Sequence, residues 1–217
     1  MKISILTLFP NMFDGFLNES IIKRAIEKKI VEVELINFRD YSIYNNKQVD
    51  DTPYGGGAGM VLMCQPIFDA INDIKDKDSL VVMLTPEGEK YNQKLASKLS
   101  NVKHLIFLCG HYEGFDERIK SIVDMEISIG DYILTGGEIP AMAISDSIIR
   151  LLDGTINKDS LLSESFNDNL FDYPVYTKPS DFRGLKVPDV LVSGDHEKIR
   201  KWRELEKVKK TEKYKKD

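Results

Sequence analysis

The segment 128–141 reads SIGDYILTGGEIPA, and it decides how the rest of this sequence is interpreted. Three glycines lie among apolar residues, and an amphipathic helix is predicted to follow over 138–152. Glycine has no Cβ, so backbone N–H and C=O groups can approach a ligand closely there. Since the segment has no P-loop lysine, phosphate is not the obvious target. The pattern predicts a loop that grips an adenine or a small polar ligand through its main chain, with a tight turn between strand and helix as the alternative.

Two further loops of similar character follow apolar runs that are predicted to be buried strands. The run LIFL at 105–108 leads into CGHYEGFDER, and the run LVVML at 80–84 leads into TPEG. Open α/β sheets bind their ligands at the carboxyl ends of parallel strands. We therefore expect the three loops to converge on one pocket.

Apolar runs alternate with helical patterns over the first 152 residues, which predicts an α/β fold with a mostly parallel sheet covered by helices. The strands are expected near 3–9, 31–37, 79–84, 103–109 and 123–128, and the helices near 20–29, 65–75, 91–99, 115–121 and 138–152. Residues 40–60 form a long polar, glycine-rich loop, and 152–187 have the composition of a linker. A last helix is predicted to begin after Asp195, its expected N-cap.

Composition favours a soluble protein of one large domain, with or without a small second one. The chain has 217 residues, 42% of them hydrophobic, and no apolar run approaches the length of a membrane span. Cys64 and Cys109 cannot form a disulfide framework, so we expect free thiols in a reducing cytoplasm.

Charge is distributed unevenly along the chain. Residues 195–217 carry ten Lys/Arg and six Asp/Glu, a net charge of +4, whereas the whole chain has a net charge of −5. A basic tail on an acidic body is typical of a local contact with nucleic-acid phosphates, and a solvated helix explains it equally well.

Together with DDTPYGGGAGM at 50–60, the three loops resemble the bacterial tRNA (guanine-N1)-methyltransferase family, and the resemblance runs from Ile3 to about Arg203. It implies transfer of a methyl group from S-adenosylmethionine to N1 of the guanosine 3′ of the anticodon in tRNA, by a cytoplasmic homodimer. It also implies a knotted α/β domain of the SPOUT class at 1–160 with a C-terminal trefoil knot. An active-site linker at 161–186 and a reduced helical tRNA-binding domain at 187–217 would follow.

The resemblance assigns residues of all three loops to the pocket of the methyl donor. They are Leu84, Pro86, Gly110, Glu113, Ile129, Gly130, Asp131, Tyr132, Ile133, Leu134 and Gly136.

The chemistry of this reaction requires a base and a cation. N1 of guanine carries a proton, and its removal leaves negative charge on O6. The family's catalytic arginine matches Arg150, although a basic residue at a helix C-terminus is also common without a catalytic role. The family's aspartate before Ser-Phe is replaced here by Glu164, the expected base. Asp168 and Asp172 are the alternatives, and any of these acids could simply be a solvated loop residue.

Histidines are few and lack metal-ligand spacing, so no zinc site is expected, and His111 is interpreted as a polar loop residue. The resemblance raises magnesium as a candidate cofactor, but no acidic cluster identifies its site. Trp202, among basic residues, fits either stacking on a base or an apolar anchor of a small helical domain.

Three other functions remain to be weighed. A knotted ribose 2′-O-methyltransferase would share the pocket, and a non-catalytic RNA-binding module would share the basic tail. A nucleotide-binding oxidoreductase is disfavoured because the segment 55–60 lacks the G-x-G-x-x-G spacing.

Overall fold

The computed structural model describes residues 1–157 and 170–214, so Glu164 and Asp168 lie outside the described residues. The chain divides into two compact units, Met1–Ile156 and Asn157–Asp217, which are described one after the other. Among the described residues, every helix is too short or too polar to cross a bilayer.

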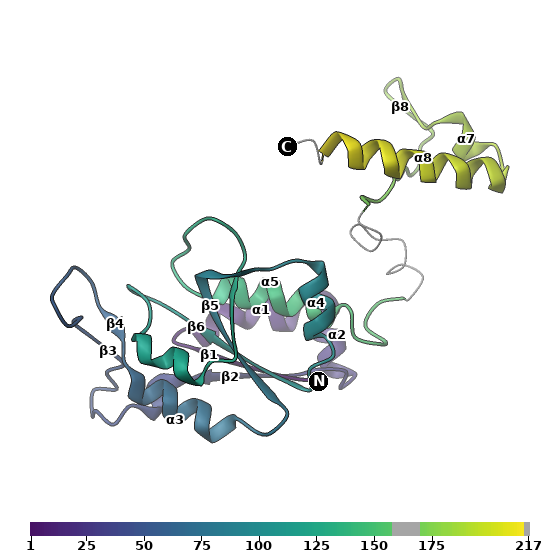
Figure 1. Cartoon of the computed structure of the whole chain (residues 1–217). Coiled ribbons are helices and arrows are strands. Elements are labelled where there is room, and N and C mark those ends of the chain that lie inside the picture. The colour runs from purple at the N-terminus through teal and green to yellow at the C-terminus, as the bar shows by residue number, and fades with distance from the viewer. Residues whose placement is uncertain (158–169, 215–217) are drawn as a thin grey trace. The chain divides into compact units, whose positions relative to one another are not determined.

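The first unit is built on a five-stranded, fully parallel sheet with the order β2-β1-β6-β5-β7 (Figure 1). The five strands confirm the five that the apolar runs predicted: β1 (Lys2–Thr7), β2 (Glu32–Asn37), β5 (Ser79–Lys90), β6 (His104–Cys109) and β7 (Met125–Ser128). All six residues of β6 are buried, because it lies inside the sheet with both faces covered. The α/β fold with a mostly parallel sheet is therefore confirmed.

Strand β5 runs further than predicted. The sequence favours an end at Leu84, since a TPEG turn signal follows. In the structure both Leu84 and Glu89 pair with Ile127, so residues 85–88 bulge out of the ladder and the strand resumes afterwards. Pairing with β7 overrides the local turn signal, and it leaves 85–88 projecting at the end of the sheet.

Helices cover both faces of the sheet (Figure 1). One apolar cluster packs the sheet against α1 (Asp14–Asn18), α2 (Ser20–Glu27), α4 (Gln93–Leu99) and α5 (Glu138–Ile149). A second cluster lies on the opposite face, beneath the 3-10 helix η2 (Phe38–Tyr41), α3 (Cys64–Ile74) and the 3-10 helix η3 (Glu117–Ile122). The helix predicted at 115–121 is thus a 3-10 helix that starts two residues later. Asp116 caps η3, because its side chain accepts the backbone N–H of Arg118.

The predicted loop 40–60 contains part of a small hairpin. Its strands are β3 (Asp50–Asp51) and β4 (Val61–Leu62). Elsewhere in this unit, a short 3-10 helix, η1 (Pro10–Phe13), follows β1.

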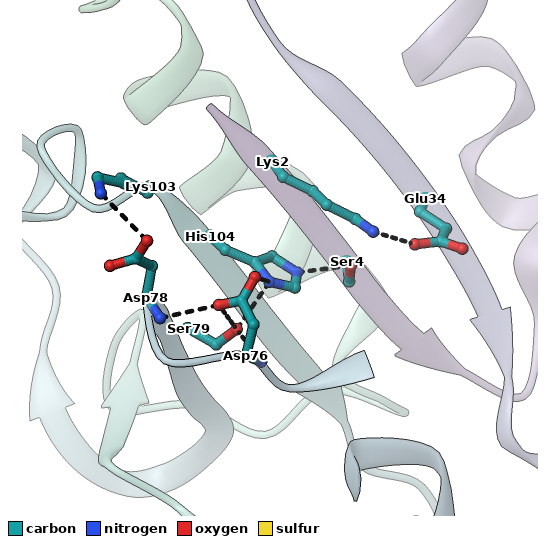
Figure 2. Close-up of polar contacts among 8 residues, drawn as sticks. All are labelled: Lys2, Ser4, Glu34, Asp76, Asp78, Ser79, Lys103 and His104. Atoms are coloured by element: carbon teal, nitrogen blue, oxygen red, sulfur yellow. Dashed lines mark hydrogen bonds and ion pairs between the residues drawn. The ribbon is translucent and has the colours of Figure 1, made fainter. Parts of the chain in front are cut away.

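A buried polar cluster ties the sheet together at the amino ends of its strands (Figure 2). His104, at the start of β6, contacts Ser4 Oγ of β1 through Nε2 at 2.9 Å and Ser79 Oγ of β5 through Nδ1 at 2.7 Å. Asp76 lies 3.7 Å from Nδ1. Burial lowers the pKa of His104 although Asp76 opposes the shift, so the imidazole is held in its neutral form.

The second unit is small. It contains a hairpin of β8 (Asp181–Phe182) and β9 (Leu185–Lys186), followed by α7 (Asp189–Val192) and α8 (His196–Tyr214). The Asp195 side chain accepts the backbone N–H of Lys198 at 3.1 Å, which confirms the predicted N-cap of α8. The hairpin lies within 170–187, the described part of the segment that has the composition of a linker.

Basic and aromatic side chains gather along α8. The guanidinium carbon of Arg203 lies 4.8 Å from the ring centre of Tyr173, and the Trp202 and Tyr176 rings are 6.4 Å apart. Trp202 is thus an aromatic neighbour of Tyr176 within this unit.

Candidate ligand pocket at the carboxyl ends of the strands

A cavity of about 550 Å³ lies in the first unit, at the carboxyl ends of β5, β6 and β7. Its walls come from the bulge 85–88, the loop 110–117 and the loop 128–137, the three segments that the sequence led us to expect together. The position is the one where open parallel sheets bind ligands. Its volume is within the range of small-molecule sites.

Most of the residues assigned to a donor pocket line this cavity: Leu84, Pro86, Gly110, Glu113, Ile129, Gly130, Tyr132, Ile133, Leu134 and Gly136. Asp131 is not among the lining residues, because its carboxylate is exposed and pairs with the Lys90 ammonium at the end of β5. Ile133 remains 79% exposed, so an apolar side chain is left uncovered at this cavity.

The glycine-rich segment before β4 supports one wall of the cavity. Glu113 donates its backbone N–H to Met60 O at 3.0 Å, and Leu62 donates to Gly114 O at 2.9 Å. A Cβ on Gly59 would lie 2.4 Å from the Glu113 side chain, so only glycine allows this approach. The segment 59–62 therefore holds the loop that carries Glu113.

Charged groups form another part of the wall. Lys120 Nζ lies 3.1 Å from Glu117 and 3.5 Å from Glu87, and both acids line the cavity. The hydrogen bond with Glu117 raises the pKa of Lys120, while hydrogen bonds from Arg118 lower the pKa of Asp116. Apolar and charged walls together suit a ligand with an apolar ring and polar groups, such as a nucleoside.

A buried carboxylate network lies beside the cavity, and sequence reasoning missed it. Glu138, the first residue of α5, is 1% exposed. Its Oε1 accepts the Thr7 hydroxyl at 2.6 Å, and its Oε2 lies 2.9 Å from His111 Nε2. We call Thr7, Glu138 and His111 the Glu138 network. The available signal was an acid directly after Gly-Gly at a helix start, where the dipole favours a negative charge.

Of the proposed catalytic residues, the structure describes Arg150 and the alternative base Asp172. Arg150 is half-buried at the C-cap of α5 and is not among the residues that line the cavity. Asp172 belongs to the second unit. No group of three or more His, Cys, Asp or Glu suited to a metal ion occurs in the described ranges 1–157 and 170–214.

A parallel sheet with a loop-lined cavity at the carboxyl ends of its strands defines the class: an α/β protein that binds a small ligand largely through its loops. Comparison with known proteins then identifies the family. The tRNA (guanine-1)-methyltransferase TrmD family matches residues 1–217, and the chain belongs to this family.

The sequences of similar proteins match nearly the whole chain. The tRNA (guanine-N(1)-)-methyltransferase of Malacoplasma penetrans is 58% identical over 217 residues, covering 100% of this chain and 96% of that protein. The protein of the same name from Bacillus pumilus is 54% identical over 97% of this chain and 88% of its own length. That of Dictyoglomus turgidum is 53% identical over 97% of this chain and 86% of its own length.

Proposed function

We propose that this protein transfers a methyl group from S-adenosylmethionine to N1 of a guanosine in tRNA, at the position 3′ of the anticodon. The observation that carries the proposal is family membership over the whole chain, together with a cavity built from the loops that the family resemblance assigns to the donor. A methyl group on N1 blocks the Watson–Crick edge of the base, which would protect the reading frame.

The cavity's chemistry suits the methyl donor. Backbone groups of Ile129, Tyr132 and Leu134 are proposed to hold the adenine, with the apolar walls around it. Glu113 supplies a carboxylate from the loop 110–117, where it can face the cationic part of the donor. When bound, the donor supplies a methyl group on a sulfonium, which is reactive toward a ring nitrogen.

The transfer to N1 requires the loss of the N1 proton. Glu164 is proposed to accept this proton as general base, with Asp168 or Asp172 as the alternatives. Arg150 is proposed to donate to guanine O6, where negative charge develops as the proton leaves. Magnesium is retained as a candidate cofactor, without an assigned site.

The trefoil knot that the family resemblance implies is also a proposal. In the sheet order, β6 lies between β1 and β5, and β7 lies on the far side of β5. The segment after β7 must return across β5, since α5 contacts both β1 and β6. Such a return is compatible with a trefoil knot of the SPOUT class over residues 1–160.

We further propose a homodimer that works on tRNA in the cytoplasm, with an active-site linker at 161–186 and a reduced tRNA-binding domain at 187–217. The cationic side chains of Arg203 and Lys207, which lie over the Tyr173 ring, support the last assignment.

The function is tested by mass spectrometry of tRNA incubated with the purified protein and S-adenosylmethionine. The expected product after nuclease digestion is 1-methylguanosine from the position next to the anticodon. A 2′-O-methylated dinucleotide would instead identify a ribose methyltransferase. Unmodified tRNA, with no heat of binding for the donor, would identify an RNA-binding module.

Two substitutions test the proposed chemistry. Glu164→Gln should retain donor binding and lower the single-turnover rate by roughly 10² to 10⁴, because a general base contributes about that much. Asp168→Asn is the matched control, and wild-type turnover in Glu164→Gln with loss in Asp168→Asn would move the base to Asp168.

Arg150→Ala should likewise leave donor affinity unchanged and lower the rate, by about 10² to 10³ for a lost donor to a developing oxyanion. Lys98→Ala is its control, since Lys98 is an exposed basic residue in the last turn of α4. Equal rates in the two variants would remove Arg150 from the chemistry.

A further inference from the structure

We propose that the Glu138 network positions the walls of the cavity and thereby sets the affinity for the methyl donor. Thr7, Glu138 and His111 are positioning residues in this proposal, acting through the loops that line the cavity. The proposal rests on the proposed function for the identity of the ligand, S-adenosylmethionine.

The network joins three elements at the point where the cavity forms. Thr7 is the last residue of β1, His111 follows β6, and Glu138 begins α5. A backbone hydrogen bond from Gly137 N–H to Gly110 O, 2.9 Å long, closes the same junction. His111, Gly110 and Gly137 all line the cavity, so the network fixes part of its wall directly.

The carboxylate of Glu138 has its partners in place. Burial of a charge is costly unless hydrogen bonds compensate it, and here Thr7 and His111 provide one bond to each oxygen. The N-terminus of α5 also stabilises a negative charge at its first residue. An ionised carboxylate can only accept, so the proposed network requires a proton on His111 Nε2. The orientation of its ring is therefore determined.

Neighbouring groups restrict His111 further. The Phe9 ring packs on the imidazole with ring centres 4.6 Å apart, and the Phe9 backbone N–H donates to Thr7 Oγ1 at 2.9 Å. A Cβ on Gly136 would lie 2.2 Å from His111 Nε2, so the loop 128–137 runs directly against the network. Any shift of His111 would consequently move a wall of the cavity.

A purely structural role does not require this chemistry. Well-packed apolar residues often stabilise a buried site as well as charged residues do. Hydrogen bonds, in contrast, set the orientation of the side chains that they join. The His104 cluster offers the comparison: Ser4 and Thr7 are both fully buried hydroxyl residues of β1 that contact another side chain. The partner of Ser4, His104, lies at the amino end of the sheet and is absent from the cavity wall, whereas His111 of the Glu138 network lines the cavity.

The test compares Thr7→Val, Thr7→Ser and Ser4→Ala in the full-length protein. Dissociation constants for S-adenosylmethionine are measured by calorimetry, the Michaelis constants for donor and tRNA by steady-state kinetics, and melting temperatures by calorimetric scans. Thr7→Val should weaken donor binding roughly tenfold, since it leaves a buried carboxylate oxygen without its partner. The tRNA Michaelis constant should not change, and Thr7→Ser should restore donor affinity. Ser4→Ala should lower the melting temperature without changing donor affinity.

Two results would overturn the inference. One is unchanged donor affinity in Thr7→Val, and the other is equal loss of affinity in Thr7→Val and Ser4→Ala, which would reveal a general effect of stability. If the wild-type protein does not bind the donor at all, that result contradicts the proposed function, and the inference, which rests on it, is contradicted as well.

Nuclear magnetic resonance of ¹⁵N-histidine-labelled wild-type protein provides a second measurement that needs no destabilised variant. The His111 signals, assigned with His111→Gln, should show a proton on Nε2. A neutral ring protonated only on Nδ1 would contradict the hydrogen bond on which the network depends.

Discussion

Gly137→Ala tests the junction between α5 and β6 most directly. A Cβ at this position would lie 2.6 Å from Cys109 Cα and 2.9 Å from Gly110 N, both backbone atoms of the end of β6 and the loop after it. Backbone atoms cannot rotate away, so the start of α5 must move. Glu138, the next residue, would be carried away from Thr7 and His111.

The expected cost follows from overpacking, about 1 to 3 kcal/mol of the free energy of unfolding. For a unit of this size, each kcal/mol lowers the melting temperature by about 2 to 4 °C, which gives a fall of about 2 to 12 °C. Calorimetric scans measure it, and donor affinity should fall in the same variant.

Gly15→Ala is the matched control for this substitution. It makes the same chemical change within helix α1, where no atom beyond the adjacent residues and the helix's own backbone lies within 4 Å of the added Cβ. Its melting temperature should stay level or rise, since alanine favours a helix by up to about 1 kcal/mol over glycine. If Gly137→Ala has the same melting temperature and the same donor affinity as the wild type, α5 does not approach β6 as described.

Two further predictions concern stability. Burial lowers the pKa of His104 below its ordinary value of 6.5, so the unfolded chain binds a proton first as the pH falls. The free energy of unfolding should therefore decrease below about pH 6.5 more steeply in the wild type than in His104→Gln, as measured by urea titrations; parallel curves would contradict a buried neutral His104. Asp195→Ala should lower the melting temperature of the second unit through the loss of about 1 kcal/mol of N-cap stabilisation, whereas Asp195→Asn retains an acceptor for the Lys198 N–H. Equal melting of the two variants would show that the side-chain cap contributes nothing.

Local pattern was sufficient to predict the strands. Runs such as LIFL at 105–108 are apolar at every position, and they are buried on both faces because helices cover the sheet. Local pattern predicted a helix at 115–121, and the structure has instead a six-residue 3-10 helix, η3, that begins at Glu117. It also ended β5 too early, because the pairing of Glu89 with Ile127 depends on a strand that lies much later in the chain.

The loops of the candidate site were recognisable from their residues, and the family resemblance supplied their roles. The roles of Arg150 and Glu164 remain predictions, since Glu164 lies outside the described residues. The donor-pocket role of Asp131 also stays a prediction, and in this structure its carboxylate pairs with Lys90.

The sequence by itself determined the α/β class, the five strands, the N-cap at Asp195 and the family, because each depends on residues close together in the chain or on long matched motifs. Only the tertiary structure decided that residues 7, 111 and 138 meet around one buried carboxylate. The parallel sheet brings these distant positions together at one edge, and no local pattern records a hydrogen bond between side chains 131 residues apart.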